Sequence, residues 1–296
     1  MVVRMPEVRG PDFLEWADTP FPFSVQGTRY MLMVATYLDA STTHDDDNPI
    51  FAVAGYVSTN LRWYHDFSAP WTGVLAREGL EYFHMTDFEN RQGPYRDWDD
   101  SRRERVITEL LDIIGKSVMH GVGAAVVLRD FEALSPDDRA FLRNPNFLCT
   151  MCCAQYLRKW ISRQPTPAGI AYVCESGEQG EGDVGDGLRE NMRVPASRVL
   201  SVTFAGKEKY PQLQSADILA YETAKQALRS AGLSSRRNVR KSMRRLLKSV
   251  HHDGGYFDAD GLRRYIPELR AFIDAVNAPP VSSSSPSSES PPSELQ

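Results

Sequence analysis

The apolar positions of the chain form two alternating patterns between residues 28 and 277. Short runs of apolar, β-branched or aromatic residues predict buried strands. These runs are found at residues 30–38, 50–58, 81–85, 121–128, 170–174 and 198–204. Apolar positions three and four apart predict amphipathic helices. This spacing is found at residues 61–77, 212–230, 236–251 and 262–276.

Local signals mark the starts of two further helices. Ser101 and Glu104 have the spacing of a capping box, and Asn144 before Pro145 has the residue types of a cap and a first helical position. The polar residues 41–49 suit a hairpin between the first two strands. Because strands and helices alternate, the sequence predicts an α/β fold, a mixed sheet flanked by helices, with extra helices near the C-terminal end.

The two ends of the chain differ from this central region. Residues 1–27 are rich in Pro and show no periodicity, so we expect an N-terminal extension. Residues 278–296 are mainly Ser, Pro and Glu, with almost nothing to bury, and we expect a disordered tail. A single domain is therefore expected over residues 28–277.

The composition is that of an ordinary globular protein with a core, at 42% hydrophobic and 25% charged residues. The net charge of -5 excludes a chain built to coat nucleic acid, so any nucleic-acid contact must come from a local basic patch. The longest apolar run, residues 30–38, is too short to span a bilayer. We expect a soluble, cytoplasmic protein without a membrane partner, and the sequence indicates no oligomeric state.

Two carboxylates come at the ends of predicted strands. Asp39 follows an almost wholly apolar run, and Glu175 follows another. In open α/β sheets ligands bind at the carboxyl ends of the strands, so both residues are candidates for a site. A carboxylate that caps a loop is the alternative for each residue taken alone.

Asp217 is the more informative carboxylate. On a helical wheel Leu213, Ala220, Ala224 and Leu228 lie within about 60° of Asp217, which places this acid on the apolar stripe. A buried carboxylate requires a cation, strong donors or a metal ion, so either a structural partner such as a buried Lys or Arg, or a functional site, is expected. Glu222 falls on the flank of the stripe, where a solvated residue or a supporting partner is expected.

Several motifs together carry a family resemblance. They are YLDAST (residues 37–42), FAVAGYV (51–57), Trp63, Trp71, FHMTDF (83–88), YVCESGE (172–178) and LQSADILAYE (213–222). In this order they resemble the bacterial family called domain of unknown function 3800. The most specific segment is the last one, which follows a Lys- and Pro-containing turn at residues 206–211.

That family is similar to a divergent branch of the ribonuclease H-like superfamily, which implies a ribonuclease H-like sheet here. In that superfamily, acids from the first strand, a later strand and a late helix bind divalent metal for phosphodiester chemistry. By position, Asp39 matches the first-strand acid, Asp217 the late-helix acid and Glu175 the acid between them. The resemblance therefore implies Mg²⁺ or Mn²⁺ as cofactor, and carboxylate oxygens suit these hard ions.

One motif departs from the family pattern. Relatives usually read Asp-Glu-Ser-Gly after the first strand, whereas this chain reads Asp39-Ala40-Ser41-Thr42. If the missing Glu binds metal in relatives, this protein binds metal weakly or not at all. His44 and the acids at residues 45–47 follow closely, but a polar turn is the expected role of these residues.

His84 and Asp87 form a second candidate pair, three residues apart at the end of the strand predicted for residues 81–85. They could orient a water, protonate a leaving group or bind metal, so they are assigned as candidate catalytic residues. A His held by a carboxylate for purely structural reasons is the equal alternative.

A basic stretch without any Asp or Glu extends over residues 223–252. It is a candidate nucleic-acid surface that contacts backbone phosphate, because it contains no aromatic residue for base stacking. The residues assigned to it are Arg236, Arg237, Arg240, Lys241, Arg244, Arg245 and Lys248. The alternative is a solvated helix face that pairs with acidic loops.

Two weaker motifs are expected to be structural. Cys149, Cys152 and Cys153 lie on a predicted helix without a second ligand pair, so buried thiols are expected rather than zinc. The Gly-rich segment at residues 177–187 is acidic and would repel phosphate, so a mobile loop is expected there.

Two functional hypotheses follow from the sequence. The first is a divalent-metal-dependent nuclease or related phosphodiester-cleaving enzyme, with a small phosphoester as a further substrate class. The second is a catalytically silent ribonuclease H-like module that binds nucleic acid or a protein partner, which the altered Asp39-Ala40-Ser41-Thr42 motif favours. The sequence does not choose between DNA and RNA.

Overall fold

A central mixed sheet organises the computed structural model, which describes residues 32–43, 49–165, 168–193, 197–235 and 238–277. In these ranges the sheet has six strands in the order β5-β4-β1-β2-β3-β6. They are β1 (Leu32–Thr42), β2 (Ile50–Thr59), β3 (His120–Val127), β4 (Ala168–Glu175), β5 (Val199–Ala205) and β6 (His252–Phe257). Strand β2 pairs antiparallel with β1 and with β3. Strand β4 pairs in parallel with β1 and with β5, and β6 pairs in parallel with β3.

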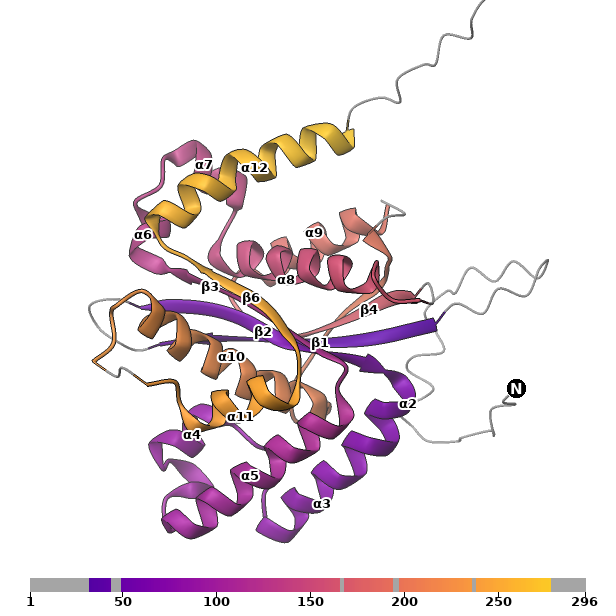
Figure 1. The fold of residues 1–296 in the computed structure, drawn as a ribbon, viewed down its shortest axis with the longest axis vertical. Coiled ribbons are helices and arrows are strands. Elements are labelled where there is room, and N and C mark those ends of the chain that lie inside the picture. The colour runs from indigo at the N-terminus through magenta and orange to yellow at the C-terminus, as the bar shows by residue number, and fades with distance from the viewer. Residues whose placement is uncertain (1–31, 44–48, 166–167, 194–196, 236–237, 278–296) are drawn as a thin grey trace, which may run out of the picture.

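Helices cover both faces of this sheet (Figure 1). One layer contains α6 (Leu128–Glu132), α7 (Pro136–Leu142), α8 (Pro145–Ile161), α9 (Glu181–Met192) and α12 (Ala259–Asn277). The opposite layer contains α2 (Asn60–Arg62), the π-helical η1 (Trp63–Ser68), α3 (Ala69–Glu78), α4 (Met85–Asn90), the 3₁₀ turn η2 (Gly93–Tyr95), α5 (Asp100–Ser117), α10 (Pro211–Ser230) and α11 (Lys241–Ser249). The α/β architecture expected from the sequence, a mixed sheet flanked by helices, is therefore confirmed.

Strand β1 is buried on both faces, because it lies in the middle of the sheet between the two helical layers. Ala35 and Tyr37 pack in the cluster that contains Trp63 and Trp71. The alternate residues Val34 and Leu38 pack in the second cluster, on the side of α8. This two-sided burial explains why the strand reads as a continuous apolar run rather than an alternating one.

Helix α10 lies against β1, β2 and β3, and most of its residues are buried. Pro211 opens the helix, where its missing N–H is not needed. Three long polar side chains on this helix, Gln214, Asp217 and Glu222, are each almost fully buried. Each of these groups must therefore find its partners inside the protein.

Most of the predicted elements are confirmed. The strands expected at residues 50–58, 121–128, 170–174 and 198–204 correspond to β2, β3, β4 and β5, and the helix expected at 212–230 corresponds to α10. Asn144 caps α8, since its side-chain oxygen accepts a hydrogen bond of 2.9 Å from the Phe147 N–H.

The strand predicted at residues 81–85 is wrong. This segment is a bend that leads into α4 at Met85. The backbone N–H groups of Phe83 and Met85 donate to the side chains of Gln214 and Asp217, at 2.9 and 2.6 Å, rather than to a neighbouring strand. Side-chain acceptors on α10 therefore replace the sheet partners that the apolar pattern suggested.

The mobile loop predicted at residues 177–187 is also wrong in its second half, because α9 begins at Glu181. Gly180 has a φ of 85°, which lets the chain turn into the helix. Glu181 and Asp183 lie in the first helical turn, where negative charge is favoured by the helix dipole. Gly187 faces Phe147, and a Cβ there would lie only 2.5 Å from the ring, so close packing explains this glycine.

Smaller corrections concern element boundaries. Asp99, not Ser101, caps α5, since its carboxylate accepts from the Arg102 N–H at 2.7 Å. The single helix expected at residues 61–77 contains the π-helical η1 between α2 and α3. The helix expected at 236–251 is shorter, since α11 covers only Lys241–Ser249. The strand β6, at the edge of the sheet, was not predicted.

Some predictions lie outside the described residues. These are the N-terminal extension, the C-terminal tail at residues 278–296, and His44 with the acids at residues 45–47. None of the helices in the described ranges is both long enough and apolar enough to cross a bilayer.

Candidate functional site

Asp39 and Glu175 lie side by side near the carboxyl ends of the neighbouring strands β1 and β4. Strands β1 and β4 are parallel neighbours, and their register pairs Leu38 with Cys174. The next residue on each strand is the carboxylate, so the register itself brings Asp39 and Glu175 together. Such carboxyl ends of parallel strands form ligand sites in α/β proteins.

Asp217 reaches the same place from α10, which packs across β1 and β2. Its side chain is 4% exposed, and its Oδ2 accepts a hydrogen bond of 2.6 Å from the Met85 N–H. The position of Asp217 on the apolar stripe, read from the sequence, explains this burial.

Lys207 joins the three carboxylates. Its Nζ lies 3.0 Å from Glu175 Oε2, 3.3 Å from Asp39 Oδ2 and 3.7 Å from Asp217 Oδ1. Its side chain is 13% exposed. The structure therefore brings Asp39, Glu175 and Asp217 together around one position, and an ammonium group occupies that position. We call these four residues the carboxylate centre.

Gln214 fixes the surroundings of the carboxylate centre. Its Oε1 accepts hydrogen bonds from Trp71 Nε1 at 2.8 Å and from the Phe83 N–H at 2.9 Å. Its Nε2 donates to the Lys207 carbonyl at 2.8 Å. One buried amide thus ties α3, the segment before α4 and the loop of Lys207 to the helix that carries Asp217.

Burial and mutual repulsion disturb the titration of the carboxylate centre. Burial raises the pKa of Asp39 well above its usual value, a hydrogen bond shared with Glu175 raises the pKa further, and the Lys207 charge partly opposes both effects. Burial likewise raises the pKa of Asp217, against the lowering effects of Lys207 and His84. Three carboxylates and one ammonium leave an excess of negative charge, which favours a bound proton or a further cation.

A small cavity adjoins the carboxylate centre. It has a volume of about 20 Å³ and is lined by Asp39, Glu175, Glu178, Asn146 and Thr150 together with apolar residues. This volume holds about one water molecule. Burial and the neighbouring Glu175 charge raise the pKa of Glu178, so this side chain adds a fourth carboxylate beside the centre.

His84 and Asp87 are paired next to the carboxylate centre. His84 Nδ1 lies 2.9 Å from Asp87 Oδ2, and each side chain is about one third exposed. His84 directly precedes Met85, whose N–H binds Asp217. The charge of a protonated His84 acts on Asp217, so the pair lies within electrostatic reach of the centre. The pairing is compatible with both the catalytic and the structural role expected for these residues.

The basic stretch is only partly available to a ligand. Arg236 and Arg237 lie outside the described residues. Arg240 pairs with Glu89 at 2.7 Å and with Glu222 at 3.0 Å, and its side chain is only 17% exposed. Glu222 is therefore a buried ion-pair partner, and the expectation of a solvated residue was wrong. Arg240 has its charge neutralised inside the protein, which does not fit the expected contact with phosphate.

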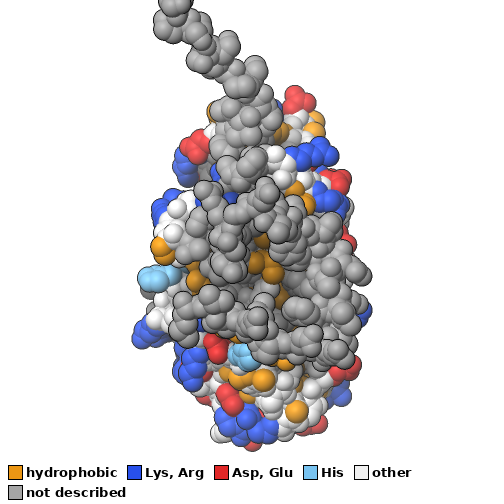
Figure 2. Space-filling model, turned by 90° about the vertical axis from the view of Figure 1, so that its right-hand side faces the viewer, with side chains coloured by type: hydrophobic (Ala, Val, Ile, Leu, Met, Phe, Trp, Pro, Cys, Tyr) orange, Lys and Arg blue, Asp and Glu red, His pale blue; other side chains and the backbone are white. Residues whose placement is uncertain are grey.

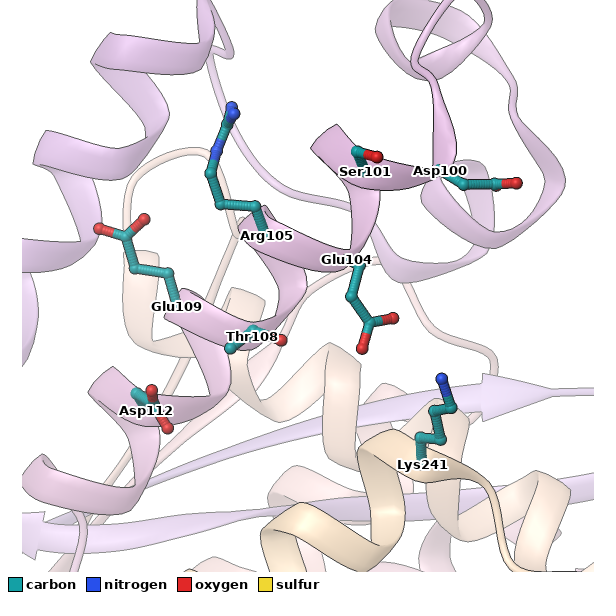
Figure 3. A pocket seen from close by; sticks show the side chains of 8 residues that line it. All are labelled: Asp100, Ser101, Glu104, Arg105, Thr108, Glu109, Asp112 and Lys241. Atoms are coloured by element: carbon teal, nitrogen blue, oxygen red, sulfur yellow. The ribbon is translucent and has the colours of Figure 1, made fainter.

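The remaining basic residues lie on α11, beside α5. Arg245 pairs with Asp112 on α5 at 2.6 Å. Figure 3 shows Lys241 extending toward α5, where Glu104 faces it across an open groove that Asp100, Glu109 and Asp112 also line. Arg244 and Lys248 are exposed. Acidic and basic side chains are also interspersed around the face in Figure 2. Of the residues assigned to the basic stretch, Lys241, Arg244 and Lys248 are thus exposed.

The cysteines are buried thiols, as expected. Cys149, Cys152 and Cys153 lie in α8 against the sheet, near Cys174 on β4, and all four are free. Within the described ranges, no three His, Cys, Asp or Glu side chains are arranged as a ready metal site. In the carboxylate centre, the Lys207 ammonium lies where the carboxylates converge.

Sequence reasoning identified the acids but missed three residues. Lys207 was noted only as part of a turn, Gln214 only as a motif letter, and Glu178 only as part of an acidic segment. Gln214 could have been found, because it lies three residues before Asp217 and therefore on the same helix face. Lys207 lies in a loop without periodicity, so no sequence pattern indicated its direction.

Comparisons with known proteins were negative, since no protein-family model matches the chain and no curated protein matches it. The function proposed below therefore depends on the geometry of the carboxylate centre and on the motifs of the sequence.

Proposed function

We propose that this protein is a divalent-metal-dependent nuclease or a related phosphodiester-cleaving enzyme of ribonuclease H-like fold, in the family called domain of unknown function 3800. The observation that carries the proposal is the meeting of three acids from the first strand, a later strand and a late helix around one cation. These are the three positions from which acids bind metal in the superfamily that the sequence resembles.

The sheet topology supports the fold in this proposal. An antiparallel meander of β1, β2 and β3 is followed by β4 and β5, which add in parallel on the free side of β1. This arrangement places the first-strand acid Asp39 and the later-strand acid Glu175 on adjacent strands, as the resemblance to the superfamily requires.

The donor set of the carboxylate centre fits Mg²⁺ or Mn²⁺ in its chemistry. All the available ligands are carboxylate oxygens, which hard divalent cations prefer. The centre already accommodates one cation, because Lys207 Nζ lies at 3.0–3.7 Å from all three acids, and a metal ion would bind beside this ammonium. Asp39, Glu175 and Asp217 would hold the ion, and a bound divalent ion would supply an activated water and charge stabilisation for phosphodiester cleavage.

The protein's own groups supply the remaining functions. Lys207 reduces the repulsion among the acids and presents positive charge at the reacting position. His84, oriented by Asp87, is the candidate to donate or accept a proton at the edge of the centre. Lys241, Arg244 and Lys248 provide sequence-independent phosphate contacts.

A cleavage assay tests the proposal. Purified protein is incubated with single-stranded and duplex DNA and RNA, with Mn²⁺ or with chelator, and compared with the Asp217→Asn variant. We expect Mn²⁺-stimulated cleavage that the variant lowers by about 100-fold or more, because it loses a ligand carboxylate. The matched control is Asp186→Asn, which removes an exposed acid paired with Arg189 and should leave cleavage unchanged. Cleavage that is absent, or equal in the Asp217→Asn variant, would contradict the proposal.

The second candidate function is a catalytically silent module that binds nucleic acid or a protein partner. Two observations favour it: the ammonium of Lys207 at the cation position, and Ala40 where relatives carry a Glu. Calorimetric titration with Mn²⁺ separates the two candidates. Absence of Mn²⁺ binding together with retained affinity for nucleic acid would establish the silent module.

A further inference from the structure

Three of the six histidines of the chain meet at one edge of the sheet. His251 directly precedes β6, and His252, the first residue of β6, pairs in register with Gly121 on β3. His120 comes just before Gly121, and its Nε2 lies 3.1 Å from Oδ2 of Asp253 on β6. We call His120, His251, His252 and Asp253 the histidine edge. None of these residues belongs to the carboxylate centre.

His120 and His252 lie on opposite faces of the sheet. His120 stacks on Trp160 of α8, with 5.3 Å between the ring centroids and 12° between the ring planes. Tyr156 of α8 lies on the same face, within electrostatic reach of the acid on β6. His252 meets Tyr56 of β2 edge-on at 5.8 Å, and Tyr56 belongs to the apolar cluster of the other face. The start of β6 is therefore held by one histidine on each face.

The ring of His252 is held in one orientation and one tautomer. Its Nδ1 lies 2.8 Å from the Val250 carbonyl, which can only accept, so Nδ1 carries the proton. The ring covers Gly121, where a Cβ would lie only 2.2 Å from Cδ2 of His252. The basic atom is therefore Nε2. This atom is buried, and no group among the described residues forms a hydrogen bond with it.

The surroundings of His252 disfavour a positive charge on its ring. Burial, with a smaller contribution from the charges of His120 and His251, lowers the pKa of His252 from 6.5 to about 4. On the side of α10, the acid Glu222 is already paired with Arg240. An imidazolium at this position would therefore be a buried charge without a partner, which is strongly unfavourable.

Strand β6 has few other contacts to hold it. Within the described ranges it is the outermost strand on its side of the sheet and pairs with β3 alone. Gly254 and Gly255, in the middle of β6, are exposed and have no side chains to pack. Figure 1 shows β6 running between α11 in one helical layer and α12 in the other. Strands with few buried contacts open at a lower free energy than the core does.

We propose that protonation of His252 separates β6 from β3, so that the histidine edge acts as an acid-sensitive latch on this side of the sheet. Separation of the strands exposes Nε2, so that water hydrates the charged ring. The folded-state pKa of His252 is lowered, so its contribution to the pairing of β6 is fully present above about pH 6.5. This contribution is lost as the pH falls toward 4. The latch is independent of the proposed function.

Amide hydrogen exchange of the full chain at pH 7 and at pH 5 tests the latch. Each exchange rate is compared with the intrinsic rate at the same pH, which gives a protection factor. We expect the protection of residues 252–257 to fall by about 10-fold or more between pH 7 and pH 5, because exposed His252 binds its proton more tightly. These residues should also be less protected than β2 at pH 5, which shows that the edge opens alone. An unchanged protection of β6, or one equal to that of β2 at pH 5, would overturn the proposal.

Variants of the histidines identify the group that responds to acid. His252→Phe keeps a ring over Gly121 but cannot titrate, so the loss of protection between pH 7 and pH 5 should disappear. His252→Asn, which keeps a donor near the Val250 carbonyl, gives the same test if the Phe variant does not fold. The matched control His251→Asn removes an exposed histidine and should keep the loss. A loss that persists in a folded His252 variant, or that disappears in His120→Asn, would overturn the assignment of His252.

Discussion

Asp39 is a buried carboxylate surrounded by other carboxylates. It is 2% exposed and shares its surroundings with Glu175 and Asp217, with Lys207 as the nearby cation. Its pKa is raised above the usual value, chiefly by burial. The folded state therefore binds a proton at Asp39 more readily than the unfolded state does. The resulting contribution to stability is present at low pH and is lost as the pH rises toward the folded-state pKa.

The Asp39→Asn variant should be more stable than the wild type, because it removes this buried charge. Without divalent ions we expect it to be more stable than the wild type at pH 8, by about 1.4 kcal/mol for each unit of raised pKa, with a smaller gap at pH 5. Urea unfolding at both pH values measures the difference. A gap that stays constant or reverses would contradict the account, and Asp186→Asn should show no such pH dependence, since that acid is exposed.

At the scale of single residues, the sequence could predict the acids but not their partner. Asp217 was predictable because a carboxylate in an apolar helical stripe is exceptional. Asp39 and Glu175 were predictable because each follows an apolar strand. The direction of the Lys207 side chain depends on a turn between β5 and α10, and no local pattern records that direction.

Helix α10 connects the separate parts of the site at the scale of elements. Gln214 binds Trp71 on α3, the Phe83 N–H before α4 and the Lys207 carbonyl. These partners lie far apart in the sequence and meet only on this helix face. The segment before α4 bends toward α10 because its N–H groups donate to Gln214 and Asp217. The strand predicted there therefore does not form.

The Gln214→Leu variant should therefore destabilise the protein strongly. It leaves the buried donors of Trp71 and Phe83 without an acceptor, and each unsatisfied group costs about 1–3 kcal/mol. Urea unfolding should show a loss of about 2 kcal/mol or more. The control is Gln226→Leu on the same helix, where a change within about 0.5 kcal/mol is expected. Equal effects of the two substitutions would show that the Gln214 contacts carry little energy.

Arg240 connects three elements by charge. It pairs with Glu89 on α4 and with Glu222 on α10, and it lies directly before α11. Burial raises the pKa of Glu222, against the opposing charge of Arg240, so the acid depends on this arginine for its charge. Arg240 therefore has a structural role as the partner of two acids, although the sequence suggested a phosphate-binding residue.

Removal of Arg240 alone should lower the stability of the protein more than removal of Arg240 together with Glu222. We expect Arg240→Leu to lose about 3–5 kcal/mol of stability, because Glu222 is left buried without a cation. The double variant Arg240→Leu with Glu222→Leu should recover a large part of that loss, since both charges are gone. A double-mutant cycle in urea makes the comparison, and a double variant no more stable than the single one would refute this role.

At the scale of the whole molecule, the fold class followed from the sequence because strand and helix periods differ clearly. Edge elements were less predictable: β6 has two glycines among its six residues, and α9 begins in an acidic, Gly-rich segment. Strand β6 forms by pairing with β3, and α9 packs through Gly187 against Phe147. Local composition does not reveal such neighbours.

The carboxylate centre holds more negative charge than Lys207 balances, since three acids surround one ammonium. A divalent ion should therefore stabilise the fold through these acids. An ion present at about 100 times its dissociation constant adds about 2.7 kcal/mol to the free energy of unfolding.

Thermal unfolding of the wild type and of Asp39→Asn at pH 8, with and without Mn²⁺, measures this stabilisation. We predict that the Asn variant is the more stable protein without the ion. We also predict that Mn²⁺ raises the unfolding temperature of the wild type far more than that of the variant, so that the difference between the two closes or reverses. An unfolding temperature that Mn²⁺ leaves unchanged, or raises equally in both proteins, would contradict these predictions.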